Sequence, residues 1–209
     1  MMLIVLFSFL IYAIIHSLLA GKNAKAAIRH RLGDRAYYGL YRLGYNIFAL
    51  LTVAPILWLM KQFPGGTIWS IPNDWQPILL FIRGIGLIGF SLSLLQIDLG
   101  RFSGLRQFYA YMSGKSLPLP DEPLQTGGVF ALVRHPLYLF SLMLTWPMAT
   151  MSAAYFGFAL SITLYFMIGS RLEEKRLLMG FGASYAAYQQ RVPWLIPVPR
   201  IRRRVPNKT

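Results

Sequence analysis

The stretch PLYLFSLMLTWPMATMSAAYFGFALSITLYFMI, residues 136–168, contains no charged side chain. It is longer than one membrane span, which takes about 20 apolar residues, and shorter than two full spans. Pro147 and the small residues at 149–154 lie in its middle and predict a tight turn. We therefore expect a helical hairpin with helices over residues 136–148 and 153–168, the second continuing through Glu173 and Glu174.

Three further apolar runs precede this hairpin, over residues 1–20, 43–60 and 78–97. Each is long enough to cross a bilayer. The first lacks the basic start of a signal peptide, so we expect it to be retained as a helix. Pro55 predicts a kink in the second run. Together the runs predict an all-α integral membrane protein with about five transmembrane helices, a C-terminal helical hairpin and a juxtamembrane cytoplasmic helix.

The composition agrees with a membrane protein. Of 209 residues, 56% are hydrophobic and 13% are charged, whereas soluble domains have about 45–50% apolar and about 25% charged residues. The chain has no cysteine and three histidines. Disulfides, thiolate metal sites and cysteine nucleophiles are therefore excluded, and we expect no metal site.

The 21 Lys and Arg outnumber the seven Asp and Glu, for a net charge of +14. Nineteen of these bases fall in three segments, residues 21–42, 98–135 and 169–209. With five spans the three segments lie on one side, which the positive-inside rule makes cytoplasmic, with the N-terminus outside. We expect these bases, including the tail ending in Arg200, Arg202, Arg203, Arg204 and Lys208, to meet anionic lipids or water rather than nucleic acid.

The connections between the runs carry few signals of regular structure. Prolines and glycines predict a loop over residues 63–77, and Pro118, Pro120 and Pro123 predict little regular structure over 98–134. The sequence GIGLIG at 84–89 matches the dinucleotide-binding pattern, but it lies within an apolar helical run rather than after a strand. We interpret its glycines as small residues that allow close helix packing.

Two polar clusters flank the hairpin. Arg134-His135-Pro136-Leu137-Tyr138 precedes its first helix, and Arg171-Leu172-Glu173-Glu174 follows its second. The hairpin should bring them together on the cytoplasmic side. Pro136 suits the first turn of a helix, whose free N–H groups favour an anion. An interfacial helix start with a basic residue and an aromatic anchor remains an equal alternative.

The adjacent carboxylates Glu173 and Glu174 project about 100° apart on a helix. One can face a pocket while the other pairs with Arg171 or Lys175. The alternative is a solvated juxtamembrane helix, although two acids so close to a bilayer are costly without a role.

An ordered set of motifs resembles a known superfamily. The set comprises Gly128, Arg134-His135-Pro136-x-Tyr138, a hairpin, Glu173-Glu174-x-x-Leu177, Phe181-Gly182-x-x-Tyr185-x-x-Tyr188 and Val192-Pro193. It is similar to the isoprenylcysteine carboxyl methyltransferase and phospholipid methyltransferase superfamily. The stretch DLGRFSGLRQ at 98–107 resembles its bacterial methanethiol S-methyltransferase branch. The first half, with His16-Ser17 and LGDRAY at 32–37, resembles a membrane family associated with denitrification.

The resemblance implies a methyltransferase of the bacterial inner membrane that uses S-adenosyl-L-methionine without a Rossmann domain. It implies a three-helix membrane region over 1–97 and a catalytic region over 98–209. The implied cofactor pocket is lined by His135, Pro136, Leu137, Tyr138, Glu173 and Glu174.

Four residues are candidates for catalysis: Arg134, Arg106 and Arg171 for acceptor electrostatics, and His135 as a base. We expect a small thiol or a lipophilic acceptor, and favour S-methylation of a thiol over methylation of a carboxyl group or a lipid amine. We also expect membrane lipids as partners. The alternative is a non-catalytic membrane accessory protein linked to nitrogen-oxide metabolism.

Overall fold

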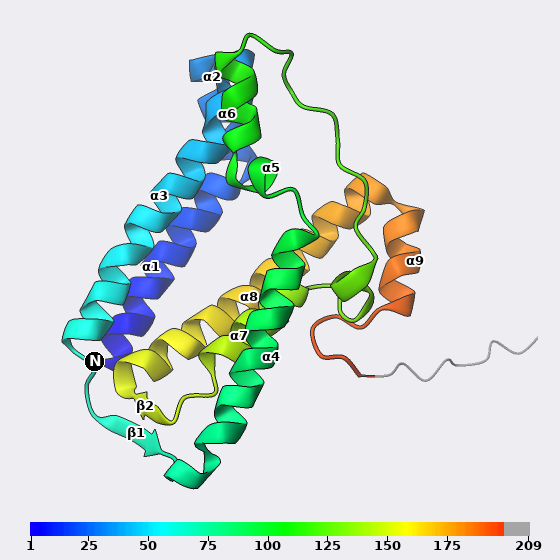
Figure 1. Ribbon diagram of the computed structural model, residues 1–209. Helices are drawn as coiled ribbons and strands as arrows, with labels where there is room; N and C mark the ends of the chain where they lie inside the picture. The colour runs from blue at the N-terminus through cyan, green and yellow to red at the C-terminus, as the bar shows by residue number, and fades with distance from the viewer. Residues whose placement is uncertain (199–209) are drawn as a thin grey trace, which may run out of the picture.

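The computed structural model describes residues 1–198 as a nearly all-helical chain (Figure 1). This confirms the predicted all-α membrane class. The basic tail from Arg200 lies outside the described residues, so its contact with lipid or water stays a prediction. The elements are α1 (Met2–Ala20), α2 (Lys22–Leu32), α3 (Asp34–Gln62), β1 (Thr67–Ser70), the 3₁₀ helix η1 (Asn73–Trp75), α4 (Gln76–Leu95), α5 (Leu99–Ser103), α6 (Leu105–Met112), the 3₁₀ helix η2 (Gly128–Ala131), α7 (Pro136–Thr145), β2 (Thr150–Ser152), α8 (Ala153–Phe181) and α9 (Ala183–Arg191).

Among the described residues, four helical segments are long and apolar enough to cross a membrane: α1, α3, α4 with η1, and α8. The predicted fifth span is shorter than expected, because α7 has only ten residues and ends at Thr145 rather than at residue 148. At 1.5 Å per residue, α7 covers about half of a hydrocarbon core of about 30 Å. The predicted extension of the last hairpin helix through Glu173 and Glu174 is confirmed by α8.

The connection between α7 and α8 pairs with the connection between α3 and α4. After α7 the chain runs to β2, which pairs antiparallel with β1, so that Trp69 faces Met151. The indole Nε1 of Trp69 also donates a hydrogen bond to the carbonyl of Met148 at 3.2 Å. The predicted loop at 63–77 therefore contains a short strand, whose partner lies in the turn of the hairpin. This pairing fixes the α3–α4 and α7–α8 connections at one end of the molecule (Figure 1).

The helices pack as two pairs joined by α8. In Figure 1, α1 lies along α3 and α4 lies along α7, and α8 contacts both α1 and α7. Glycines allow the α4–α7 contact, as the sequence predicts. A Cβ on Gly89 would overlap the ring of Phe140, and one on Gly86 would lie 3.1 Å from the Cβ of Met143.

The outer faces of the bundle are apolar. On α1, exposed side chains recur every three or four residues, at Leu3, Phe7, Leu10, Ile14 and Leu18, as expected of one helix face turned to lipid. The opposite face of α1 contributes Val5 and Phe9 to a core that includes Ile56 and Ala154.

The expectation of little regular structure over 98–134 is wrong for its first part, which forms α5 and α6. The carboxylate of Asp98 accepts a hydrogen bond from the backbone N–H of Arg101 at 3.0 Å and so caps α5. Gly104 follows with a φ of 93°, which favours glycine and lets the chain turn into α6. The guanidinium of Arg35 ties α6 to α3 by donating to the carbonyls of Tyr111 and Lys115, both at 3.0 Å.

Candidate functional site

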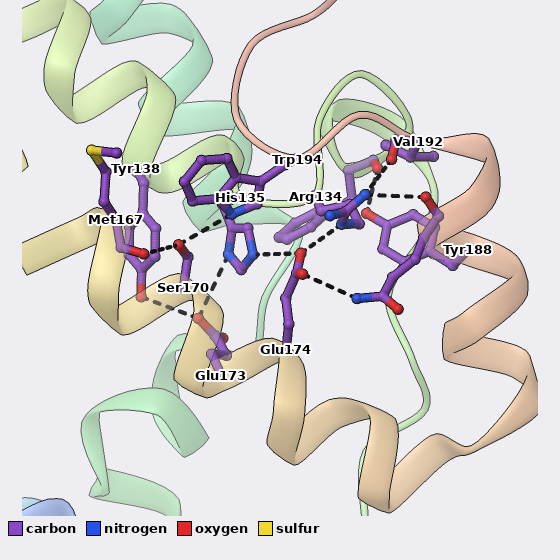
Figure 2. Close-up of polar contacts among 12 residues, drawn as sticks. Arg134, His135, Tyr138, Met167, Ser170, Glu173, Glu174, Tyr188, Val192 and Trp194 are labelled. Atoms are coloured by element: carbon purple, nitrogen blue, oxygen red, sulfur yellow. Dashed lines mark hydrogen bonds and ion pairs between the residues drawn. The ribbon is translucent and has the colours of Figure 1, made fainter. Parts of the chain in front are cut away.

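The backbone around Arg134 and His135 is held by the segment that follows α9. The N–H groups of Arg134 and His135 donate to the carbonyl of Trp194 at 3.1 and 3.3 Å. The chain then enters α7 at Pro136, whose missing N–H costs nothing in the first helical turn. Figure 2 shows how this places both side chains against α8.

The two predicted polar clusters meet directly. The Nε of Arg134 lies 2.6 Å from Oε1 of Glu174, and their side chains are 7% and 14% exposed. The Nη1 of Arg134 also donates to the carbonyls of Gln189 and Val192, at 3.1 and 2.7 Å. A guanidinium that makes several such bonds is fixed in position, which compensates for the cost of its burial.

Glu174 is also bound from two other directions. Its Oε1 lies 3.2 Å from Nε2 of His135, and its Oε2 accepts a hydrogen bond from the amide of Gln189 at 3.0 Å. Gln189 reaches the site because α9 folds back after Gly182, whose φ of 54° favours glycine. Residues from two other segments of the chain therefore converge on this carboxylate of α8 (Figure 2).

Glu173 is the accessible member of the acidic pair. Its Oε2 accepts a hydrogen bond from the hydroxyl of Tyr138 at 3.1 Å and lies 3.6 Å from Nδ1 of His135. Its side chain is 48% exposed. The expectation that one of the two acids pairs with Arg171 or Lys175 is wrong, because both acids turn toward residues of the Arg134–Tyr138 stretch. The hairpin supplies nearer donors than the same helix does.

Three aromatic rings form a continuous stack beside the acids. The rings of His135 and Tyr138 are 5.3 Å apart and nearly parallel at 3°. Tyr138 stacks in turn on Phe166 of α8, at 4.4 Å and 10°. The stack fixes the imidazole plane and leaves its two nitrogens facing the two carboxylates (Figure 2).

The protonation of His135 follows from burial. Burial lowers the pKa of His135 below its ordinary value of 6.5, against the opposing pull of Glu173 and Glu174. The ring is therefore neutral at pH 7 and has one N–H. The nearer carboxylate is Glu174, at Nε2. We therefore place the proton on Nε2, donated to Glu174, and the lone pair on Nδ1.

Two tyrosines of α9 complete the surroundings. Burial raises the pKa of Tyr188 to about 12, and its hydroxyl donates to the carbonyl of Phe130 at 2.6 Å. Tyr185 is 1% exposed, and its hydroxyl has no hydrogen-bond partner among the described residues. An unpaired buried hydroxyl is costly, and the ring of Tyr185 packs against that of Tyr188 at 5.8 Å.

Of the other predicted site residues, Pro136, Leu137 and Arg171 lie at or beside the cluster, and Arg106 lies away from it. Pro136 and Leu137 lie in the first turn of α7. Arg171 lies at the edge of the cluster, with its guanidinium 4.9 Å from the ring centre of Trp194. Arg106 is not part of the cluster, since it lies on α6 and pairs with Asp98 at 2.7 Å.

Gln189 and Trp194 are members of the cluster that the sequence did not single out. Their positions next to the Tyr188 and Val192-Pro193 motifs were the available signal. Trp194 also donates from Nε1 to the hydroxyl of Ser170 at 3.1 Å, which ties the segment after α9 to α8.

Comparisons with known proteins agree with these motifs. The chain is 29% identical over 199 residues to Methanethiol S-methyltransferase 2 of Bradyrhizobium diazoefficiens, covering 95% of this chain and 74% of the relative. It is 31% identical over 189 residues to Methanethiol S-methyltransferase of Crocosphaera subtropica, covering 90% and 71%. It is also 25% identical over 169 residues to Nurim of Xenopus laevis, covering 78% and 58%.

No family model matches the chain. No solved structure matches it either. The similarity to the Crocosphaera subtropica protein nevertheless extends over most of both chains. The chain belongs to the family of the methanethiol S-methyltransferases, within the isoprenylcysteine carboxyl methyltransferase-like superfamily.

Proposed function

We propose that this chain is a membrane methyltransferase that transfers a methyl group from S-adenosyl-L-methionine to a small thiol. One observation carries the proposal: the imidazole of His135 lies between a part-buried carboxylate, Glu174, and a half-exposed one, Glu173. The relatives named methanethiol S-methyltransferase support a thiol as the acceptor, rather than a carboxyl group or a lipid amine.

The residues of the cluster fit this methyl donor. Glu173 offers an accessible anion to a ligand with a sulfonium and an amino group. The outer end of the stack of His135, Tyr138 and Phe166 provides a flat surface for the adenine ring. We assign Glu173 and Glu174 to the ribose or amino group, and His135, Pro136, Leu137 and Tyr138 to the lining of the pocket.

When bound, S-adenosyl-L-methionine would supply an electrophilic methyl carbon: a thiolate sulfur bonds to it in line, and the bond to the sulfonium sulfur breaks, so that S-adenosylhomocysteine leaves and a thioether remains. A free thiol has a pKa of about 8.5 and is mostly protonated at neutral pH, so a base accelerates the reaction. His135 takes this proton at Nδ1. Glu174 holds the opposite N–H, and Glu173 stabilises the imidazolium that forms.

The arginines have different roles in this scheme. Arg134 is fully engaged with Glu174 and two carbonyls, so we propose that it positions Glu174 rather than contacting the acceptor. Arg171 is exposed at the edge of the cluster and is the better candidate for attracting an anionic acceptor. Arg106 lies with α5 and α6, and we propose no catalytic role for it.

Two measurements on purified protein test the proposal. The first is binding of S-adenosylhomocysteine, and the second is transfer of a labelled methyl group to methanethiol, compared with carboxylate and amine acceptors. We expect His135→Gln to lose transfer, while Lys175→Gln, which alters an exposed cation of the same helix, behaves as the wild type. Binding without transfer to any acceptor would instead favour the non-catalytic accessory protein.

A further inference from the structure

A second polar site lies away from the His135 cluster, next to α5 and α6. A cavity of about 430 Å³ is lined by Arg101, Leu105, Arg106, Tyr109, Ala110, Lys115 and Leu119, and we call it the basic cavity. Its lining combines three cations with apolar side chains. Nothing in the proposed methyl transfer uses it.

The charge around the basic cavity is not balanced. Arg106 pairs with Asp98 at 2.7 Å, and the Nε of Arg101 lies 3.7 Å from a carboxylate oxygen of Glu122. Lys115 sits 5.1 Å from the centre of the Tyr109 ring and has no acidic partner among the ion pairs of the described residues.

Two more cations, Arg35 and Arg42, hold the same region by donating to backbone carbonyls of Lys115, Tyr111 and Phe102. Five cations therefore stand against three acids of the same segments, Asp98, Asp121 and Glu122. The surplus of positive charge favours an anion in the cavity.

Arg101 is the less exposed of the two arginines that line the cavity. Its side chain is 17% exposed, and its Nη1 donates to the carbonyl of Pro120. Its Nε is buried and has no hydrogen-bond partner among the described residues. A phosphate group accepts hydrogen bonds from a guanidinium in a geometry that arginine prefers, so Arg101 is suited to an anion in the cavity that it lines.

The surface beside the basic cavity is apolar. On α6 the exposed Leu105, Phe108, Tyr109 and Met112 follow the spacing of one helix face, and Leu99 and Phe102 of α5 are exposed nearby. Figure 1 shows α5 and α6 beyond the end of α4, at the end of the bundle opposite β1 and β2. Short amphipathic helices with cations at such a level lie in the headgroup region of a bilayer.

We propose that the basic cavity binds the phosphate group of an anionic phospholipid, whose acyl chains lie along the exposed apolar face of α5 and α6. Arg101 and Arg106 contact the phosphate, and Lys115 closes its outer side. The apolar lining favours a lipid over a free phosphate, because a free phosphate gains nothing from Leu105 and Leu119. The site does not depend on the proposed methyl transfer.

Native mass spectrometry of the full chain in detergent tests this site. The probes are dioctanoyl phosphatidylglycerol, dioctanoyl phosphatidylcholine and inorganic phosphate. We expect one phosphatidylglycerol to bind in clear preference to phosphatidylcholine. Arg106→Gln and Lys115→Gln, both at exposed side chains, should each weaken that binding about fivefold, as expected for the loss of one cation at a lipid surface.

Lys175→Gln is the matched control, because it removes one exposed cation of α8, outside the basic cavity, and should leave binding unchanged. Equal binding of the two lipids, or equal weakening by all three substitutions, would overturn the proposal. So would tighter binding of inorganic phosphate than of phosphatidylglycerol, since it would assign the cavity to a soluble anion. Arg101→Lys, which keeps the charge but loses the planar guanidinium, should weaken binding while the protein stays folded.

Discussion

The Nε of Arg134 lies 2.6 Å from Oε1 of Glu174, although the two residues are 40 positions apart in the sequence. The contact joins the start of α7 to a point well inside α8, so it forms only when the hairpin is closed. It also depends on α9 and the segment after it, which supply Gln189 and the carbonyl of Val192. One buried ion pair thus connects three parts of the chain that the proposed methyl transfer requires.

Removing one partner of this pair should destabilise the protein strongly. Arg134→Met leaves the part-buried carboxylate of Glu174 with only His135 and Gln189 as partners, and we expect it to lower the free energy of unfolding by about 3 kcal/mol. Thermal unfolding in detergent measures the loss. The control is Arg29→Met, which breaks a pair with Asp34 of the same 2.6 Å length on the exposed surface. If the two variants lowered the unfolding temperature equally, burial would not explain the strength of the Arg134–Glu174 pair.

Tyr138→Phe tests the contribution of the Tyr138 hydroxyl separately from that of its ring. The variant keeps the stack between His135 and Phe166 but loses the hydrogen bond to Glu173. We expect S-adenosylhomocysteine to bind about three- to tenfold more weakly, as for the loss of one hydrogen bond, with little change in thermal stability. Tyr138→Ala also removes the stack, so it should lower both the affinity for S-adenosylhomocysteine and the thermal stability. Unchanged binding in Tyr138→Phe would remove Glu173 from the proposed pocket.

Gly89 should tolerate no larger residue. A Cβ at this position would overlap the ring of Phe140, so Gly89→Ala must push α4 and α7 apart, at a cost of about 1–3 kcal/mol. Gly84 lies on the same helix with open space around its Cβ position. Gly84→Ala should therefore leave thermal stability unchanged or raise it by about 0.5–1 kcal/mol. If Gly84→Ala lowered the thermal stability more than Gly89→Ala, the packing of α4 against α7 described above would be contradicted.

Stability should depend on pH through His135. Its pKa in the folded protein is below 6.5, so under that pH the unfolded chain binds a proton that the folded protein does not. The stability that neutral His135 contributes is therefore fully present above about pH 6.5. The free energy of unfolding falls as the pH decreases from there toward the lowered pKa. Thermal unfolding between pH 5 and 8 measures the effect. His135→Gln should make the stability less dependent on pH over this range. If the wild type and His135→Gln had the same pH profile, a neutral His135 would be contradicted.

The orientation predicted from charge can be tested because the chain has no cysteine. Lys61 lies at the β1 end of α3, and Lys115 lies near α6 at the opposite end. In intact bacterial cells, a membrane-impermeant maleimide should label Lys61→Cys, while Lys115→Cys should react only after the cells are permeabilised. If only Lys115→Cys were labelled in intact cells, the orientation would be the opposite of the predicted one, with the His135 cluster outside.

Much of the site followed from local pattern. The apolar stretch at 136–168 predicts a hairpin, and a hairpin brings its two flanking polar clusters to the same end of the molecule. Composition and helix periodicity act over one turn or one span, so they are visible in the sequence. They also predict the continuation of α8 through Glu173 and Glu174 and the role of the glycines at 86 and 89.

Other features depended on partners distant in the chain. The ten-residue length of α7 is tied to the pairing of β1 with β2, which no local pattern of 150–152 announces. The helices α5 and α6 form where prolines lie nearby, because Asp98 caps one and Arg35 binds the end of the other. Gln189 joined the site only through the turn at Gly182.

By itself, the sequence determined which segments are apolar, how long they are and where the charges lie between them, since each follows from residue type and spacing. The tertiary structure decided which donor each carboxylate accepts from. On α8 the side chains of Glu173 and Glu174 can turn toward Arg171, Lys175 or another helix, and the sequence treats these choices alike. Packing of α7, α8 and α9 places Arg134, His135 and Tyr138 nearest, and the buried acid therefore pairs across the hairpin.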